Sequence, residues 1–360
     1  MQTRQLGEST LQVSPIVFGA WAIGGWAWGS TTNREDEERA AIRAMHAALA
    51  AGVNAIDTAP VYGFGLSEEL VAKALQGRRD QVLVLTKLGL RWDDTQGQLW
   101  FETKDQDGVP RSVHRTARPE SVRHEVEQSL RRLRIDCIDL MQVHWPDAAT
   151  PIEDTLGALL ELRRAGLVRE IGLSNHGVDL LRRAKQSLAS ATEGSVPLAS
   201  TQPKYSLLAR DVERDVLPWC HDESVGVLVY SPLEQGLLTG KVPASRSFDS
   251  TDGRHKRATF EAANRAKVNQ VVESVLRPMA ETHRATCAQV ALAWVIAQPG
   301  VTAAIAGART AAQAEENAGA AALQLSAAEL AQMRIAFEAL QLNSPGAPTL
   351  WRRVLRWLRS

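Results

Sequence analysis

The chain has 360 residues, of which 44% are hydrophobic, and its 41 basic and 41 acidic residues give no formal net charge. Apolar residues in that proportion can build a large core without disulfide support. The balanced charge provides no general attraction to nucleic acid or to an acidic surface, so a small-molecule function is favoured.

Targeting and metal-binding signals are weak. Residues 1–5 lead into no apolar signal region, and the longest apolar stretch, residues 290–297, is too short to cross a bilayer. The three cysteines, Cys137, Cys220 and Cys287, are widely spaced and odd in number. This pattern fits unpaired thiols in a reducing compartment and no metal site. We therefore expect a cytoplasmic protein with no membrane span and no metal.

The regular elements begin with a short hairpin, predicted from residues 5–7 and 11–13, that covers the N-terminal end of the fold. Eight apolar runs of strand length follow: 16–21, 53–56, 82–86, 138–143, 169–173, 198–201, 225–230 and 302–306. Most of them do not alternate, which is typical of strands buried on both faces, and segments of helical period separate nearly every pair. The pattern predicts an α/β fold, a closed (β/α)8 TIM barrel, formed by residues 1–342.

Several helix boundaries are marked by capping signals. Pro119 is placed to open one helix. The segments 150–153 (Thr-Pro-Ile-Glu) and 326–329 (Ser-Ala-Ala-Glu) each predict a capping box. Gly166 provides the left-handed exit from the helix that starts near residue 151.

Three segments exceed what the alternation of strands and helices needs. The predicted loops 88–118 and 241–256 are interpreted either as lids or substrate walls at the C-terminal mouth of the barrel, or as solvated insertions. Residues 343–360 form a linker followed by a basic segment with apolar residues. Two placements remain open for this basic tail: contact with an anionic membrane or a partner, and packing on its own barrel.

Three ionisable residues directly follow or end predicted strands, and a fourth lies close by. Asp57, Lys87 and His144 occupy these strand ends, and Tyr62 follows Asp57 by five residues. Each alone has an ordinary interpretation, as a helix cap, a solvated strand end or a polar residue near the core. Because the C-terminal strand ends of such a barrel face one mouth, we expect all four to meet in a candidate active site.

This combination fits carbonyl reduction, which adds a hydride to carbon and a proton to oxygen. Tyr62 would donate the proton, and a neighbouring Lys87 ammonium would lower the tyrosine pKa from about 10. Asp57 would keep Lys87 charged. A neutral His144 would orient the substrate carbonyl through a ring nitrogen.

Longer motifs resemble one known family. Segment 57–68 (Asp-Thr-Ala-Pro-Val-Tyr-Gly-Phe-Gly-Leu-Ser-Glu) resembles the signature around the aspartate and tyrosine of the aldo-keto reductase superfamily, and segment 84–87 (Val-Leu-Thr-Lys) resembles its lysine strand. Segment 142–147 (Gln-Val-His-Trp-Pro-Asp) and Tyr205 resemble the bacterial NADPH-dependent branch. The resemblance covers residues 6–317.

The resemblance implies NADP(H) as cofactor and assigns positions to it. The nicotinamide carboxamide would be held by Ser174, Asn175 and Gln202, and its ring would stack on Tyr230. The segment over the pyrophosphate would include Ser231, Leu233, Gln235 and Gly236. The adenosine-phosphate contacts would be Gly307, Arg309, Gln313 and Asn317.

A phosphate site at residues 305–310 is also what this fold predicts independently, at a helix start after the last strand. Arg309 suits a ribose 2′-phosphate, which favours NADP(H). Gly307 and Gln313 stand where other branches of the family have basic residues, so NAD(H) remains an alternative.

We therefore expect an NADP(H)-dependent reductase that converts aldehydes or ketones to alcohols, with a small-molecule carbonyl substrate and no nucleic-acid partner. The alternative is an NADPH-binding regulatory or redox-sensing subunit with little turnover. A metal-dependent barrel hydrolase is disfavoured because His144 has no neighbour at ligand spacing.

Two substrate classes remain open. Apolar or aromatic carbonyls are favoured if tryptophans wall the mouth; the candidates are Trp21, Trp92 and Trp145, with Trp26 or Trp28 reaching it from the first loop. Anionic carbonyls are favoured if the site is rimmed by Arg111, Arg115 and Arg118.

Overall fold

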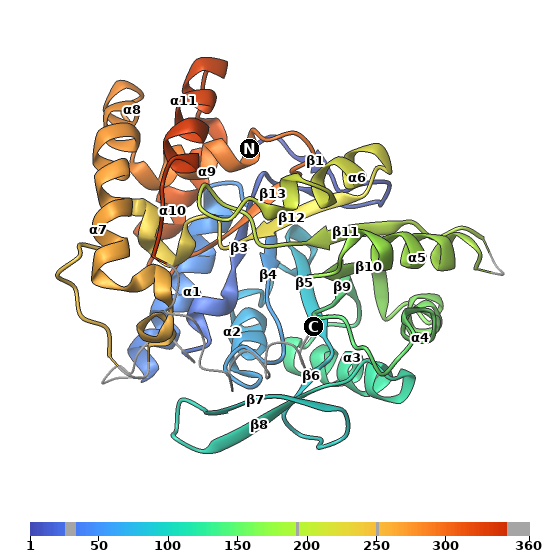
Figure 1. Cartoon of the computed structure of the whole chain (residues 1–360). Coiled ribbons are helices and arrows are strands. Elements are labelled where there is room, and N and C mark those ends of the chain that lie inside the picture. Colours follow the sequence, from blue (N-terminus) through green and yellow to red (C-terminus); the bar gives the residue numbers. More distant parts are fainter. Residues whose placement is uncertain (26–33, 192–193, 250–251, 344–360) are drawn as a thin grey trace, which may run out of the picture.

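The computed structural model describes residues 1–25, 34–191, 194–249 and 252–343. Eight parallel strands form a closed barrel in which chain neighbours pair (Figure 1). They are β3 (Ile16–Gly19), β4 (Ala55–Asp57), β5 (Leu83–Leu88), β9 (Ile138–Val143), β10 (Val168–Ser174), β11 (Leu198–Gln202), β12 (Gly226–Tyr230) and β13 (Ala303–Gly307). Each predicted apolar run overlaps one of them, so the predicted (β/α)8 barrel is confirmed.

Helices surround the strands (Figure 1). The α-helices are α1 (Arg34–Ala50), α2 (Leu66–Ala74), α3 (Pro119–Leu133), α4 (Ile152–Arg164), α5 (Val178–Ala189), α6 (Val216–Asp222), α7 (Ala262–Val271), α8 (Arg277–Thr282), α9 (Cys287–Ile296), α10 (Ala311–Gly319) and α11 (Ala327–Glu338). The 3-10 turns are η1 (Ala20–Ile23), η2 (Arg79–Gln81), η3 (Asp211–Glu213), η4 (Glu234–Thr239), η5 (Gly253–Lys256), η6 (Ala258–Phe260) and η8 (Ala320–Ala322). A π-helical turn, η7 (Val272–Leu276), joins α7 to α8. No helix in the described ranges is long and apolar enough to cross a membrane.

The helix ends test the capping predictions. Ser326 and Glu329 form the predicted capping box of α11, Pro119 opens α3, and Gly166 follows α4 with a φ of 77°. The box predicted at 150–153 is wrong, because α4 begins at Ile152 and the Thr150 hydroxyl instead donates to Asp147 at 2.7 Å. The Asp147 carboxylate therefore accepts the hydrogen bond of the Thr150 hydroxyl, which the sequence pattern had assigned to the start of the helix.

The barrel interior is closed at one end by the N-terminal hairpin, which pairs β1 (Arg4–Gln5) with β2 (Gln12–Val13) as predicted. Leu6, Leu11 and Val13 are fully buried against inward-facing strand residues such as Val17 and Leu85. A second, larger core lies between the strands and the helices. Because apolar side chains fill this end of the barrel, polar side chains can gather at the opposite mouth.

The segment expected to be a long loop at 88–118 contains an antiparallel three-stranded sheet, which we call the insert sheet. Its order is β6 (Leu90–Arg91), β8 (Pro110–Arg115) and β7 (Gln98–Lys104). In Figure 1 it lies below the barrel, at the end opposite to β1. The sequence indicated a long connection here but not its strands, because these strands carry charged side chains and alternate poorly. By contrast, the described part of 241–256 holds only the η5 turn.

The tail prediction cannot be compared with the structure, because residues 344–360 lie outside the described part of the chain. The division into residues 1–342 and 343–360 stays a prediction.

The insert sheet is anchored to the barrel by a buried carboxylate. Gly89, between β5 and β6, donates its N–H to both carboxylate oxygens of Glu125 on α3, at 3.0 Å each. Ser121 also donates to Glu125, at 3.3 Å. Burial raises the pKa of Glu125 to about 8, although these hydrogen bonds oppose the change. The protonated form is therefore the one that the fold favours.

Replacing Glu125 by glutamine should stabilise the protein in a pH-dependent way. The folded-state pKa lies above the ordinary 4.5, so the contribution of Glu125 to stability is present below that value and is lost as the pH rises to about 8. Glutamine stays neutral, so Glu125→Gln should raise Tm by about 3 °C or more at pH 8.5 and by little at pH 4.5. Thermal unfolding followed by circular dichroism measures both. Glu127→Gln, exposed on the same helix, is the control; equal shifts at both pH values for Glu125→Gln would contradict the prediction.

Candidate active site

The strand ends bring the four predicted catalytic side chains to the mouth of the barrel. Asp57 ends β4, Lys87 lies near the end of β5, His144 follows β9, and Tyr62 lies in the turn before α2. Lys87 Nζ lies 2.6 Å from Asp57 Oδ1, 2.9 Å from the carbonyl oxygen of Thr58 and 3.2 Å from Tyr62 Oη. Asp57 and Lys87 are both buried. The tyrosine hydroxyl is thus in direct contact with a buried ammonium group.

The position of Tyr62 is fixed by close backbone packing. Gly63 has a φ of 65°, and a Cβ there would lie 2.2 Å from the carbonyl oxygen of Gly24. A Cβ on Gly24 would lie 2.9 Å from the carbonyl carbon of Tyr62. Only glycines allow these two segments to meet so closely. The Tyr62 ring then meets the His144 ring edge-on, with centroids 5.9 Å apart.

The protonation states follow from burial and from the Lys87–Asp57 pair. Burial lowers the pKa of Lys87, but the negative charge of Asp57 and the contact with Tyr62 outweigh it, so the net pKa is raised and the ammonium is retained. Burial, followed by the charge of Lys87, holds the pKa of His144 well below 6.5, which keeps the ring neutral as expected. A charged Lys87 and a neutral His144 are the states expected from the sequence.

The expected net lowering of the Tyr62 pKa is wrong for this structure. Burial raises the pKa of the phenol above 10.0, and Asp57 adds to that effect. Lys87 lowers it through its charge and its hydrogen bond, as expected, but does not overcome the loss of hydration. Desolvation depends on tertiary packing, which the spacing of residues does not reveal. Tyr62 therefore remains protonated throughout the neutral range.

An amide network joins this group to the next strands. Asp57 Oδ2 accepts hydrogen bonds from Gln202 Nε2 at 2.8 Å and from Gln142 Nε2 at 3.4 Å. Gln202 also donates to Gln142 Oε1 at 3.2 Å. The sequence analysis gave Gln142 no individual role, although a fully buried polar residue inside the apolar run 138–143 is a usable signal. Gln142 completes the shell of donors around Asp57.

The residues predicted to hold the nicotinamide carboxamide lie beside the four predicted catalytic side chains. Ser174 Oγ donates to the carbonyl oxygen of Gln202 at 2.8 Å, and Asn175 Nδ2 donates to the carbonyl oxygen of His144 at 3.0 Å. Tyr230 Oη donates to Asn175 Oδ1 at 2.9 Å. These contacts fix the polar side chains at the ends of β10, β11 and β12.

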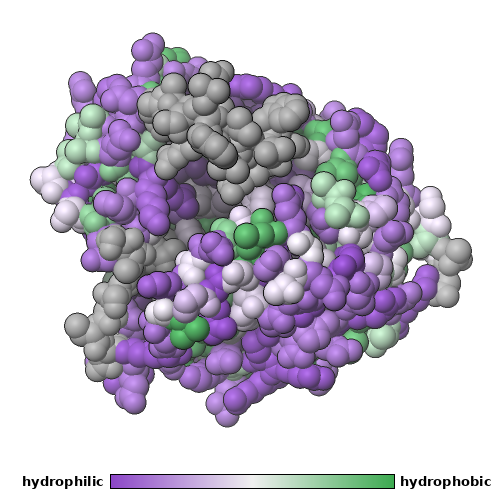
Figure 2. All heavy atoms as spheres, turned by 60° about the horizontal axis from the view of Figure 1, so that its bottom comes forward, coloured by the Kyte–Doolittle hydropathy of each residue, from purple (hydrophilic) through white to green (hydrophobic). Residues whose placement is uncertain are grey.

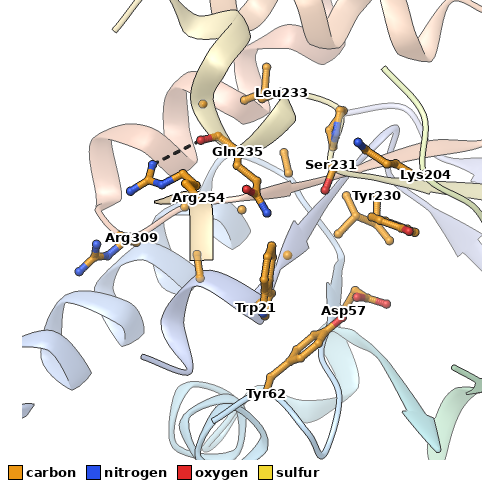
Figure 3. A pocket seen from close by; sticks show the side chains of 18 of the residues that line it. Trp21, Asp57, Tyr62, Lys204, Tyr230, Ser231, Leu233, Gln235, Arg254 and Arg309 are labelled. Atoms are coloured by element: carbon orange, nitrogen blue, oxygen red, sulfur yellow. Dashed lines mark hydrogen bonds between the residues drawn. The ribbon is translucent and has the colours of Figure 1, made fainter. Parts of the chain in front are cut away.

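A single cavity of about 650 Å³ connects these groups (Figure 3). The predicted site residues that line it are Trp21, Asp57, Tyr62, His144, Trp145, Ser174, Asn175, Gln202, Tyr230, Ser231, Leu233, Gln235, Gly236, Gly307, Arg309, Gln313 and Asn317. Lys87 is fully buried behind Tyr62 and Asp57. Figure 2 shows the mouth end of the molecule, where hydrophobic side chains lie around a hollow near the centre of the face.

The segment over the cavity has an unusual backbone. Ser231, Glu234, Gln235 and Gly236 all have positive φ values, of 56°, 46°, 55° and 96°. Conformations of this kind turn successive N–H groups into anion-binding concavities, and three of these residues are not glycine. Arg254 reaches the segment by donating to the carbonyl oxygen of Gln235 at 3.4 Å (Figure 3). This wall can accept a phosphate group.

The far end of the cavity is formed by the start of α10. Arg309 N donates to Gln313 Oε1 at 2.8 Å, and Asn317 Nδ2 donates to the carbonyl oxygen of Gly307 at 3.1 Å. The Arg309 guanidinium is half-exposed and lies 3.1 Å from Glu37 on α1. A helix start with a nearby arginine suits a second phosphate.

One predicted substrate residue lies elsewhere. Trp92 is not among the described residues that line the cavity, and its ring packs edge-on against Phe64 at 5.7 Å. Trp100 and Phe101 of the insert sheet line the cavity instead, together with Leu90. Sequence reasoning noted this segment but could not tell which aromatic residue faces inward. Trp26 and Trp28 lie outside the described residues.

The described residues contain no group of three or more histidines, cysteines or carboxylates that could hold a metal ion. The chemistry that the described side chains can support is proton donation from a phenol, orientation of a polar group by a neutral imidazole, and the binding of amide and phosphate groups.

Comparison with known proteins places this chain in a family. The Aldo/keto reductase family profile matches residues 15–338. The NADH-specific methylglyoxal reductase of Escherichia coli is 36% identical, over 95% of this chain and 100% of its own. The aldo-keto reductase YhdN of Bacillus subtilis is 35% identical, over 88% and 87%. The structure of the glycerol dehydrogenase AKR11B4 from Gluconobacter oxydans matches with a TM-score of 0.81 and 34% identity, covering 97% of this chain and 98% of that one.

The Lys87–Asp57 pair yields a stability prediction. Lys87→Met leaves the buried Asp57 carboxylate without its cation, and should lower the free energy of unfolding by about 3–5 kcal/mol. The double variant Asp57→Asn, Lys87→Met carries no unpaired charge and should lose less. Urea denaturation measures the free energy of unfolding of the unmodified protein, the single variant and the double variant.

Lys73→Met is the matched control, because Lys73 contacts Glu38 at 2.8 Å in a half-exposed pair. That change should cost no more than about 1 kcal/mol. If the two single variants lost the same stability, the buried pair would not have the importance assigned to it.

Proposed function

Because this chain belongs to the aldo/keto reductase family, we propose that it reduces aldehydes or ketones to alcohols with NADP(H), with Tyr62 as the proton donor. The observation that supports this most is the 3.2 Å contact of Tyr62 Oη with Lys87 Nζ beside a cavity lined by amide groups. The bound nicotinamide cofactor supplies the hydride that the carbonyl carbon receives. The residues described above donate the proton, orient the carbonyl group and hold the cofactor.

The cavity walls fit a nicotinamide dinucleotide in three places. Asn175 and Gln202 place amide oxygens next to the predicted catalytic side chains, while their N–H groups donate to protein acceptors. The positive-φ segment 231–236 suits a pyrophosphate. The start of α10 with Arg309 suits a phosphate on the ribose. Together they support the assigned order of nicotinamide, pyrophosphate and adenosine along the cavity.

The proton transfer follows from the protonation states. Tyr62 holds its proton at neutral pH and releases it from Oη to the carbonyl oxygen as negative charge develops there. Lys87, kept charged by Asp57, stabilises the phenolate that remains, and the proton is then restored from solvent. Neutral His144 orients the carbonyl oxygen. The carbonyl has then gained one hydride and one proton, which makes an alcohol.

The preference for NADP(H) over NAD(H) rests on Arg309. Its guanidinium is half-exposed at the adenosine end and, among the described residues, forms a surface ion pair with Glu37. A ribose 2′-phosphate can replace that carboxylate at the arginine. The Escherichia coli relative is named NADH-specific, so the preference needs a direct measurement.

We also propose that residues 1–342 form the reductase domain, that 343–360 form a separate basic tail, and that the protein is cytoplasmic. Unpaired cysteines at 137, 220 and 287 support a reducing compartment. The alternative function, an NADPH-binding regulatory or redox-sensing subunit, requires bound cofactor with little turnover.

Tyr62→Phe should lower kcat for aldehyde reduction by about 100-fold or more and leave the Kd for NADPH nearly unchanged, because the hydroxyl acts on the carbonyl oxygen. In the unmodified protein, the rate should stay level from about pH 6.5 to about 9, because the pKa of His144 is lowered well below its usual value and the pKa of Tyr62 is raised above its usual value. NADPH oxidation followed by absorbance across this range measures both. Tyr205→Phe, which removes a hydroxyl bonded to Glu213, is the control and should keep kcat within about threefold.

Near-normal turnover by Tyr62→Phe would rule out its role as the proton donor. Tight NADPH binding with no turnover of any carbonyl by the unmodified protein would support the sensory alternative.

Arg309→Ala should weaken NADPH binding by about tenfold or more and NADH binding by less than about threefold, because only NADPH carries the 2′-phosphate. Fluorescence titration with each cofactor measures both constants. Arg34→Ala on α1 removes an exposed arginine that pairs with Asp107, and should change neither constant. Equal losses of both cofactors in Arg309→Ala would exclude a specific 2′-phosphate contact.

A further inference from the structure

The insert sheet contains a register shift where it meets the cavity. In the pairing of β7 with β8, Leu99 lies opposite His114 and Phe101 lies opposite Val113, so Trp100 is an extra residue. Successive residues of a regular strand face opposite sides of the sheet. The β-bulge removes that alternation, and Trp100 and Phe101 both line the cavity. Leu99, just before the bulge, is half-exposed.

Trp100 is held in place from more than one side. The Arg115 guanidinium lies over its ring at 4.5 Å from the centroid, and Arg115 is itself buried and donates to Gln98. The Trp145 ring lies 5.6 Å away. Cation–π and aromatic contacts of this kind each contribute about 0.5–2 kcal/mol. The indole is therefore a fixed part of the wall.

The side of the cavity near Tyr62 is apolar. Val61 and Leu90 belong to one buried cluster against which Tyr62, Trp100 and Trp145 pack. Trp21 adds its ring 6.5 Å from that of Tyr62. A substrate whose carbonyl oxygen contacts Tyr62 would thus rest its remaining groups on aromatic and aliphatic surface.

The three arginines expected at the rim do not face the cavity. Arg111 contacts Asp105 at 2.9 Å, Arg118 contacts Glu120 at 3.0 Å, and the Arg115 guanidinium stacks on the Trp100 ring. None of the three is among the described residues that line the cavity.

Cations do line another part of the cavity. Figure 3 shows Arg254 beside Gln235, Lys204 beside Ser231 and Tyr230, and Arg309 at the far end of the cavity, all of them away from Tyr62. Lys204 is paired with Glu234 at 3.0 Å, and Arg254 is paired with Asp252 at 2.6 Å. Positive charge is therefore concentrated where the cofactor phosphates are proposed to lie.

We infer that the bulge at Trp100 determines the substrate class: Trp100 and Phe101 form, with Leu90, Trp21 and Trp145, a neutral wall that selects uncharged aromatic or bulky apolar carbonyl compounds over anionic ones. This inference rests on the proposed reductase function. An aromatic ring gains free energy by leaving water for this wall, whereas a carboxylate loses its hydration without meeting a cation. The expected discrimination is at least about tenfold in kcat/KM.

The test compares benzaldehyde, 4-carboxybenzaldehyde and propanal as substrates of the full chain with NADPH. The unmodified protein should have a kcat/KM at least about tenfold higher for benzaldehyde than for its carboxylate analogue. Trp100→Ala should lower kcat/KM for benzaldehyde by about tenfold and that for propanal by less than about threefold, because only the ring needs the indole. Trp100→Phe should keep most of the preference.

Trp92→Ala is the matched control, since Trp92 belongs to the same aromatic cluster but does not line the cavity. It should leave the ratio between the two benzaldehydes unchanged within about twofold. Equal or better use of the carboxylate compound by the unmodified protein would overturn the inference. So would an equal change of the ratio in Trp92→Ala and Trp100→Ala.

A binding measurement separates this inference from the proposed function. If none of the aldehydes is turned over, the proposed function fails, and the wall is judged by binding of benzamide and 4-carboxybenzamide to the NADPH-loaded protein. Tighter binding of the neutral compound, weakened by Trp100→Ala and not by Trp92→Ala, would uphold the inference. Equal binding of the two compounds would reject it.

Discussion

The arrangement of the site depends on the buried ion pair between Lys87 and Asp57. An ammonium group that is removed from water needs a nearby negative charge and further acceptors. Asp57 and the carbonyl oxygen of Thr58 provide them, at 2.6 Å and 2.9 Å. The third N–H group of Lys87 donates to Tyr62 Oη. The same contacts that make burial of the charge tolerable therefore also position the phenol.

The pair extends its influence through the second oxygen of Asp57. Gln202 and Gln142 donate to that oxygen, and Gln202 also receives a hydrogen bond from Ser174 at its carbonyl group. Residues from neighbouring strands are in this way tied to one carboxylate. A shift of the amide groups that face the proposed cofactor would disturb Asp57, and through it Lys87. The predicted catalytic side chains and the residues proposed to hold the nicotinamide are therefore linked by hydrogen bonds between buried residues.

The pattern of strands buried on two faces predicted the barrel and the meeting of Asp57, Tyr62, Lys87 and His144 at its mouth, whereas the predicted cofactor positions came from the family resemblance. A strand of that kind leaves a long apolar run, and its C-terminal end is bound to face the mouth. What the sequence did not reveal depends on contacts between distant segments. The insert sheet is formed by short strands with charged side chains, the Thr150 hydroxyl bonds to Asp147, and the net pKa of Tyr62 is set by burial. The catalytic, cofactor-binding and substrate-binding roles assigned to the cavity residues remain predictions.

The insert sheet and the Lys87–Asp57 pair are attached to the barrel at different points, although Leu90 and Val113 of the sheet pack against Tyr62. The sheet begins after Gly89, whose N–H is held by Glu125 of α3, whereas Lys87 makes its contacts inward, toward Asp57. The residue pairing of β5 with β4 and β9 spans Leu83–Leu88 and ends before that glycine. Inserting or deleting one residue in β7 would shift the register, move Phe101 to the other face of the sheet and leave the strand ends of the barrel where they are. The barrel thus fixes the position of the proposed proton donor, while the register of a separate sheet fixes which side chains form the proposed substrate wall.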